Sequence, residues 1–215
     1  SVTTSCVIKV KNGFFEIPNT INYPCFVKPN VSKNASKKLI TKCMNEAELQ
    51  RFLETIRQKN VELLVEDYIE VKKEYGILGL STKNGVIAPG FFEKDVCGHK
   101  DRYGVPLHGK TIMSPKLKCI AEDIIRFIEA LNFEGLFDVD LVESDDGVIY
   151  FVELNLRTGA SGYAITKSGV NLPGMLADYV YFNTPIDMNC EMKSPEKTFL
   201  SERVLLDEYR NGYVT

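Results

Sequence analysis

The chain has 215 residues, of which 44% are hydrophobic and 26% are charged, and its net charge is −3. This composition is typical of a folded domain and excludes a disordered or low-complexity chain. With 26 basic and 29 acidic residues, the sequence lacks the excess positive charge on which nucleic-acid binding usually relies. We therefore expect no nucleic-acid partner.

No apolar run approaches the roughly 18 residues of a membrane span, and no basic-then-apolar leader opens the sequence. We expect no membrane partner. Six cysteines are scattered singly, with no CxxC and only two histidines, which favours reduced thiols in a cytoplasmic protein over a disulfide framework or a zinc site. The chain starts at Ser1, and we expect it to be a fragment of a longer protein.

The first third of the sequence predicts a small α+β unit. A short apolar strand covers residues 23–29 and ends at Lys28 and Pro29, followed by a polar loop. Asn45 and Glu48 have the spacing of a helix-capping box. The residues that follow have the apolar spacing of an amphipathic helix: Leu49, Phe52, Leu53 and Ile56.

A buried strand is predicted over residues 61–69, and a hairpin is predicted around the turn signal Asn84-Gly85. Residues 90–113 lack periodicity and contain both His99 and His108, so we expect a long loop there. Loop histidines are more often surface groups than catalytic ones, and we assign these two no role.

In the second half, Ser114-Pro115 predicts the start of a helix that continues to Leu131. Two strands follow over residues 137–142 and 148–154, joined by Asp145-Asp146-Gly147. A polar loop is expected over residues 157–171, and a last helix over residues 172–181.

The register of the second hairpin can be calculated from its turn. If Asp146-Gly147 is a two-residue turn, Asp140 faces Glu153 and Asp138 faces Asn155. Alternation then places these four polar side chains on one face of the sheet. The other face carries the apolar residues Val139, Leu141, Val152 and Leu154.

Facing carboxylates repel each other, so a cation is expected between them. Two carboxylates and an amide (Asp140, Glu153 and Asn155) are ligands that suit Mg²⁺ or Mn²⁺. Arg157 continues the same face and begins a glycine-containing loop, a combination suited to a polyphosphate. The alternative is a solvated acidic sheet face and a plain connecting turn, and charge spacing alone does not decide between the two.

Several segments in this order resemble an ATP-grasp domain: Phe-Val-Lys-Pro (26–29), Leu-Leu-Val-Glu-Asp-Tyr-Ile (63–69), Asp-Val-Asp-Leu (138–141) and Tyr-Phe-Val-Glu-Leu-Asn-Leu-Arg (150–157). The resemblance covers nearly all of residues 21–185. Within the superfamily the sequence is similar to carbamoyl-phosphate-synthetase-like and D-aspartate-ligase-like members, and less similar to D-alanine–D-alanine ligases.

The resemblance implies an α+β fold with two α+β subdomains, the nucleotide between them, and an antiparallel sheet in the larger one. The implied divisions are an N-terminal arm over residues 1–20, a small subdomain over residues 21–72 and a large subdomain over residues 73–215. It also implies an ATP- and Mg²⁺-dependent carboxylate–amine or carboxylate–thiol ligase that acts through an acyl phosphate. Its partners would be small-molecule carboxylates and amines, and a homodimer is compatible with it.

The resemblance assigns a role to each candidate site residue. Lys28 and Arg157 would be catalytic, Lys28 on the nucleotide phosphates and Arg157 on the transferred phosphoryl group. The expected nucleotide-binding residues are Lys28, Ser32, Ser36, Glu66, Asp67, Ile69 and Glu74. The expected metal ligands are Asp140, Glu153 and Asn155, and the expected substrate contacts are Arg157, Gly159, Ser161 and Lys167.

Two departures from the family pattern keep an alternative open. The loop over the phosphates, Ser32 to Ser36, contains no glycine, and only 27 residues precede Lys28, too few for the family's N-terminal domain. We therefore expect that domain to be missing from this chain. The alternative function is a non-catalytic, regulatory ATP-binding module.

Overall fold

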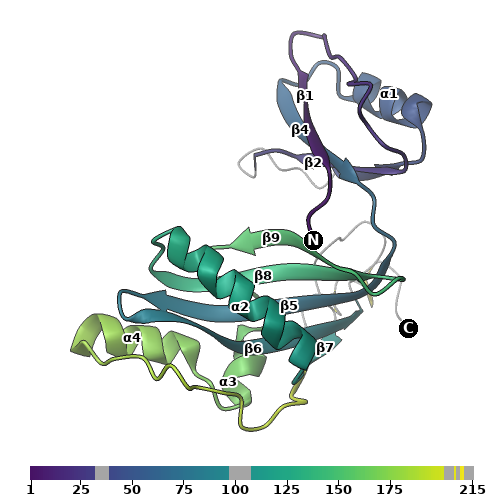
Figure 1. Ribbon diagram of the computed structural model, residues 1–215. Helices are drawn as coiled ribbons and strands as arrows, with labels where there is room; N and C mark the ends of the chain where they lie inside the picture. Colours follow the sequence, from purple (N-terminus) through teal and green to yellow (C-terminus); the bar gives the residue numbers. More distant parts are fainter. Residues whose placement is uncertain (32–38, 97–107, 201–205, 207–208, 211–215) are drawn as a thin grey trace. The chain divides into compact units, whose positions relative to one another are not determined.

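The computed structural model describes residues 1–31, 39–96, 108–200, 206, 209 and 210. The described chain forms two compact units, Ser1–Glu70 and Val71–Thr215 (Figure 1). Each unit combines an antiparallel sheet with helical structure, one helix in the first unit and three in the second among the described residues, so the predicted α+β class is confirmed. The first unit includes residues 1–20, where we expected an arm: Ser5–Val10 forms a strand of its sheet.

The sheet of the first unit has four strands in the order β1-β4-β2-β3. Their bounds are Ser5–Val10 (β1), Cys25–Pro29 (β2), Thr41–Cys43 (β3) and Val61–Asp67 (β4). Strand β4 lies between β1 and β2 and pairs with both in antiparallel fashion. The predicted strand that ends at Lys28 and Pro29 is thus confirmed as β2, an inner strand.

Helix α1 (Glu46–Thr55) begins where the capping box predicts it. The Asn45 side chain accepts a hydrogen bond from the Glu48 backbone N–H at 3.0 Å, and the Glu48 carboxylate accepts one from the Met44 N–H at 2.8 Å. Leu49 and Leu53 are fully buried, because they share a core with inward-facing residues of the sheet such as Val27.

The second unit contains a six-stranded sheet in the order β10-β7-β6-β5-β8-β9. The strand bounds are Val71–Thr82 (β5), Gly85–Val96 (β6), His108–Thr111 (β7), Gly135–Ser144 (β8), Ile149–Asn155 (β9) and Thr198–Leu200 (β10). All pairs are antiparallel. The hairpin predicted at Asn84-Gly85 is confirmed, with Thr82 paired to Gly85.

Helices lie on both faces of this sheet. Helix α2 (Pro115–Ala130) crosses one face (Figure 1), capped at its start by Ser114 as predicted, and Phe127 packs edge-on against Phe151 of β9. Helix α3 (Gly162–Lys167) lies on the other face, because Ile165 packs against Gly90 of β6. Helix α4 (Leu172–Phe182) corresponds to the last predicted helix.

Two predicted loops contain regular structure. Residues 90–113 were expected to be one long loop, but β6 continues to Val96 and β7 occupies His108–Thr111. This expectation was wrong because the paired strands need no local periodicity once neighbouring strands supply their hydrogen bonds. The loop expected over residues 157–171 contains α3. His99 lies outside the described residues.

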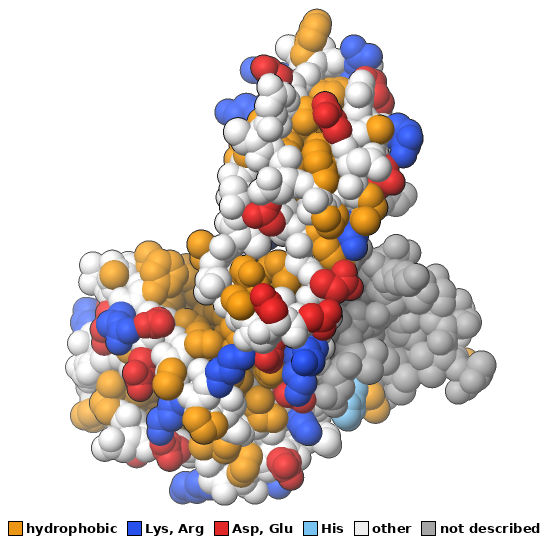
Figure 2. Space-filling view, turned by 45° about the vertical axis from the view of Figure 1, so that its right-hand side comes forward, with side chains coloured by type: hydrophobic (Ala, Val, Ile, Leu, Met, Phe, Trp, Pro, Cys, Tyr) orange, Lys and Arg blue, Asp and Glu red, His pale blue; other side chains and the backbone are white. Residues whose placement is uncertain are grey.

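No helix among the described residues is long and apolar enough to cross a membrane. Figure 2 shows acidic, basic and hydrophobic side chains intermixed over the described surface on the side that it presents. This agrees with the nearly balanced charge of the sequence.

Candidate functional site

The β8–β9 hairpin brings the predicted acidic residues together. Asp140 pairs with Glu153, and Asp138 pairs with Asn155, as the sequence predicts. Directly paired residues of an antiparallel sheet project on the same side. The three candidate metal ligands Asp140, Glu153 and Asn155 therefore share one face of the second unit, which we call the acidic face.

The route to this register differs from the predicted one. The turn has one residue more than expected, since the Gly147 N–H donates to the Ser144 carbonyl at 2.9 Å and Glu143 pairs with Ile149. A bulge then leaves Val152 without a partner between Phe151 and Glu153, which restores the predicted pairs. Val152 is 37% exposed, so its predicted place in the apolar face was wrong.

The donor chemistry of the acidic face fits a magnesium ion. Asp140 and Glu153 offer carboxylate oxygens and Asn155 offers an amide oxygen, the ligand types that Mg²⁺ prefers. Among the described residues, no group of three or more histidine, cysteine or acidic side chains is arranged around a metal position. The candidate set therefore rests on two carboxylates and one amide, and it leaves coordination positions for water or phosphate oxygens.

Lys94 of β6 is a site residue that the sequence analysis missed. Its amine lies 2.6 Å from Asp140 Oδ1 and 3.8 Å from Glu74 Oε2, and its side chain is only 7% exposed. A cation was expected between Asp140 and Glu153; Lys94 instead lies between Asp140 and Glu74. The sequence did not reveal this position of Lys94, because the register between β5 and β6 shifts by one residue between Leu78 and Leu80. The shift places Lys94 opposite Glu74.

Asp138 was correctly placed on this face from the sequence but was assigned no role there. It is 7% exposed, and its Oδ1 atom has no hydrogen-bond partner in the described part of the chain. Burial, followed by the nearby Asp140 carboxylate, raises the pKa of Asp138, and Lys94 and Arg157 partly offset this rise, so that the pKa is about 7. The sequence feature that could have identified Asp138 as a site residue is its spacing from Asp140: two residues apart on one strand, the two side chains project from the same face.

The residues expected to contact substrate follow β9. Arg157 is exposed and donates to the Thr158 carbonyl at 3.2 Å. Gly159 lies against Asp138, since a Cβ atom at this position would be only 1.7 Å from Asp138 Oδ2. The structure thus brings Gly159 and Arg157 close to the acidic face.

Ser161 and Lys167 are placed at opposite ends of α3. Ser161 is 5% exposed just before the helix, whereas Lys167 is exposed, with its amine 5.2 Å from the centre of the Tyr163 ring. Six residues along a helix separate them by about 9 Å of rise. The structure does not bring these two side chains together.

The first unit contains the remaining candidate residues. Lys28 of β2 forms an ion pair with Glu66 of β4 at 2.5 Å, and both side chains are mostly buried. In the expected adenine hinge, Glu66 to Ile69, two backbone N–H groups already have partners within the first unit. The Asp67 N–H donates to the Thr4 carbonyl at 3.1 Å, and the Tyr68 N–H donates to the Pro24 carbonyl at 3.0 Å. Ser32 and Ser36 lie outside the described residues.

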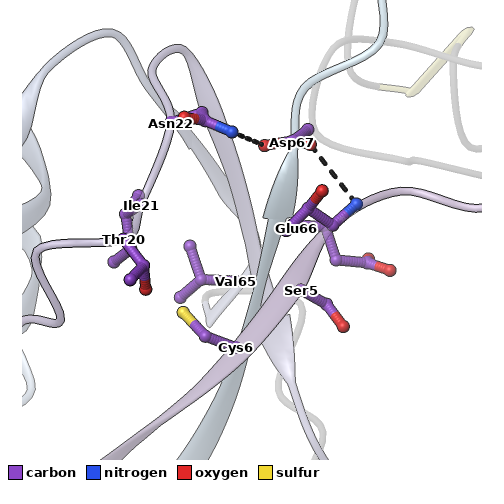
Figure 3. A pocket seen from close by; sticks show the side chains of 9 residues that line it. Ser5, Cys6, Thr20, Ile21, Asn22, Val65, Glu66 and Asp67 are labelled. Carbon is purple, nitrogen blue, oxygen red and sulfur yellow. Dashed lines mark hydrogen bonds between the residues drawn. The ribbon is translucent and has the colours of Figure 1, made fainter.

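A shallow depression lies beside this hinge, between β1, β4 and the segment Thr20–Asn22 (Figure 3). At its rim the Asn22 amide donates to Asp67 Oδ1 at 3.1 Å, and the Thr4 N–H donates to Asp67 Oδ2 at 3.3 Å. These bonds occupy the Asp67 carboxylate inside the first unit. Glu74, expected on the ribose, belongs to the second unit, and its Oε2 atom lies 3.8 Å from the Lys94 amine.

Known proteins are similar to this chain in sequence and in fold. A D-alanine–D-alanine ligase from Bacillus cytotoxicus is 26% identical over 184 residues, which are 79% of this chain and 49% of that protein. The L-amino acid ligase from Bacillus licheniformis has a TM-score of 0.61 at 18% identity and covers 83% of this chain and 43% of its own. For the N5-carboxyaminoimidazole synthase from Aspergillus clavatus, solved with ADP and 5-aminoimidazole ribonucleotide, the TM-score is 0.67 at 15% identity, with 90% of this chain and 51% of that one covered.

The chain spans about half the length of the curated relatives that it matches first. D-alanine–D-alanine ligases are among these relatives, so the expectation that the chain is less similar to them than to other branches of the superfamily is not supported. The ATP-grasp domain family matches residues 1–172, four fifths of the chain. The chain belongs to the ATP-grasp family.

Proposed function

We propose that this chain is the ATP-binding part of an ATP- and Mg²⁺-dependent ligase that joins a carboxylate to an amine. The observation that carries the proposal is the acidic face, where Asp140 lies opposite Glu153, with Asn155 on the same strand and the buried amine of Lys94 between β5 and β8. Family membership and the names of the relatives support the same reaction class.

In this reaction the substrate carboxylate attacks the γ-phosphate of ATP, and ADP leaves. The amine then attacks the acyl carbon of the acyl phosphate, and inorganic phosphate leaves. Such chemistry needs positioning and charge neutralisation rather than a protein nucleophile. Asp140, Glu153 and Asn155 would hold Mg²⁺, which supplies positive charge to the phosphate oxygens when bound.

The cationic side chains would act on the phosphates. Lys28 and Lys94 each lie in an ion pair, with Glu66 and Asp140 respectively, so each amine is already held on its strand. A triphosphate would compete for these amines, because charge-assisted bonds to phosphate are strong. Arg157 is exposed and able to face the transferred phosphoryl group.

Calorimetric titration of the chain with ATP, with and without Mg²⁺, tests this proposal. We expect Mg²⁺-dependent binding that weakens by tenfold or more in Lys28→Ala and Glu153→Ala. The matched controls are Lys83→Ala and Asp123→Ala, whose side chains are 78% and 74% exposed on the second unit. Unchanged, equally Mg²⁺-dependent binding in Glu153→Ala would contradict the metal assignment.

Formation of ADP then separates a ligase from a regulatory ATP-binding module. A protein that contains this chain is incubated with ATP, Mg²⁺ and mixtures of amino acids that supply both carboxylate and amine. The ligase proposal expects ADP release that requires both substrates and is lost in Glu153→Ala. Tight ATP binding without ADP release under any of these mixtures would favour the regulatory module.

A further inference from the structure

Asp138 carries a buried carboxylate that none of the roles above uses. It lies on the acidic face two residues before Asp140, and its Oδ1 atom is both inaccessible and without a hydrogen-bond partner among the described residues. Buried polar atoms are nearly always paired, since an unpaired one loses its hydration without compensation. Asp138 Oδ1 is an exception, and a hydrogen-bond donor from a bound ligand would satisfy it.

Glycine backbone borders this carboxylate on two sides. A Cβ atom at Gly159 would lie 1.7 Å from Asp138 Oδ2, and one at Gly76 would lie 3.5 Å from Oδ1. Gly159 thus covers the carboxylate with main chain alone, in the loop that joins Arg157 to α3. Access to the buried carboxylate therefore requires this short loop to move.

The surroundings favour a positively charged ligand. Asp140 and Glu153 add negative charge around Asp138, and the cations Lys94 and Arg157 donate no hydrogen bond to its Oδ1 atom. The described residues contain no group of three acidic, histidine or cysteine ligands around this atom, and Asp138 lies outside the candidate metal set of Asp140, Glu153 and Asn155. A primary ammonium group needs fewer fixed partners, because each of its N–H bonds can pair separately.

Building on the proposed ligase function, we propose that Asp138 Oδ1 binds the protonated amino group of the amine substrate under the loop 157–161. The position suits the reaction, because Asp138 is about 7 Å along β8 from Asp140 on the same face. The amino group would then lie next to the phosphates that the acidic face holds, and it would lose one proton to solvent before its lone pair attacks the acyl carbon. Asp138 is a substrate-binding residue in this proposal, outside the set of metal ligands.

Binding of a simple ammonium ion tests the subsite directly. The chain is labelled with ¹³C and its aspartate carboxyl resonances are assigned by triple-resonance experiments, which require no variant. Methylammonium is then titrated at constant ionic strength with Mg²⁺ present. We expect a saturable shift of the Asp138 carboxyl resonance, and no such shift with potassium or with tetramethylammonium, which has no N–H to donate. No shift at Asp138, or a shift at Asp140 alone, would overturn the proposal.

Steady-state kinetics give the second test. In Asp138→Asn, which keeps the shape of the side chain, we expect the KM for the amine to rise tenfold or more while the KM for ATP changes less than twofold; a bond to a charged partner is worth this factor. Asp123→Asn on α2 is the matched control. An unchanged amine KM in Asp138→Asn would overturn the proposal.

The two proposals can fail separately. A methylammonium shift at Asp138 in a chain that releases no ADP would support the subsite and contradict the ligase. ADP release that needs an amine, combined with no shift and an unchanged amine KM in Asp138→Asn, would support the ligase and contradict the subsite.

Discussion

The amine of Lys94 lies 2.6 Å from Asp140 Oδ1, so a cation of the protein itself occupies the carboxylate that we assign to a metal ion. The pair is shielded, since the Lys94 side chain is 7% exposed. Glu74, at 3.8 Å, shares the same amine. Binding of Mg²⁺ to Asp140 therefore has to displace or weaken this ion pair.

Replacing Lys94 by methionine separates its two expected effects. Lys94→Met keeps much of the side-chain length but removes the competitor for Asp140, so the affinity of the nucleotide-free chain for Mg²⁺ should increase severalfold. Affinity for MgATP should fall by tenfold or more, because a phosphate ligand is lost. Calorimetry with Mg²⁺ and with MgATP measures both, and Lys83→Met, at an exposed lysine, is the control. A decrease in both affinities would contradict competition between Lys94 and the metal.

The sequence predicted most elements of the fold, because their signals are local. The caps Asn45 and Ser114 and the hairpin at Asn84-Gly85 were all found where predicted. The pairs of Asp140 with Glu153 and of Asp138 with Asn155 were also correct, although a longer turn and a bulge at Val152 compensate for each other. Correct pairing there depended on two deviations that no periodicity reveals.

Lys94 could not be placed from the sequence because strand register depends on tertiary packing. Gly79 of β5 pairs with Phe137, and a Cβ atom at Gly79 would lie 2.2 Å from the Phe137 ring, so the sheet allows only glycine there. Opposite this position β6 has an extra residue, next to Pro89. A glycine and a proline inside strands indicate a bulge. They do not indicate in which direction the strand register shifts, because packing against the neighbouring strand decides this.

The contact between Gly159 and Asp138 predicts a large effect of one added methyl group. In Gly159→Ala the Cβ atom would lie 1.7 Å from Asp138 Oδ2, so the loop must move, at a cost of about 1–3 kcal/mol in the free energy of unfolding. Combining the change with Asp138→Ala should recover most of this loss. Urea denaturation measures both variants. Gly76→Ala is the control, since its Cβ would meet Asp138 only at 3.5 Å and should cost much less. Equal losses with and without Asp138 would contradict the contact.

The hydroxyl of Ser168 connects the end of α3 to β7. It is fully buried, lies 2.9 Å from Thr111 Oγ1 and donates to the Ala164 carbonyl at 3.0 Å. Ser168→Ala should lower the free energy of unfolding by about 1–3 kcal/mol, because a buried partner at Thr111 loses one bond. Thr166→Ala on the same helix removes a longer bond, 3.3 Å, from a less buried hydroxyl and should cost less. Thermal and urea unfolding test the order of the two variants, and the reverse order would contradict the role of Ser168.

Glu143 predicts how stability depends on pH in the acid range. Its carboxylate accepts hydrogen bonds from Tyr75 Oη at 2.6 Å and from Lys116 Nζ at 3.0 Å, and Lys72 lies nearby. The Tyr75 bond, followed by the Lys116 bond, lowers the pKa of Glu143 below its ordinary value. The folded chain therefore binds this proton less tightly than the unfolded chain, and the stabilisation is present above the ordinary glutamate pKa of about 4.3 and is lost as pH falls through the lowered pKa.

Glu143→Gln removes this titration while it keeps the side-chain shape. The difference in free energy of unfolding between the original chain and Glu143→Gln should be about 1 kcal/mol near neutral pH and should shrink toward zero as the pH falls below about 4. Urea denaturation at a series of pH values measures the difference. Tyr75→Phe removes the largest cause of the lowered pKa, so the stabilisation by Glu143 should be smaller in that background and should disappear at a higher pH. A difference that stays constant from neutral to acid pH would show that Glu143 stabilises the second unit by packing rather than by its charge.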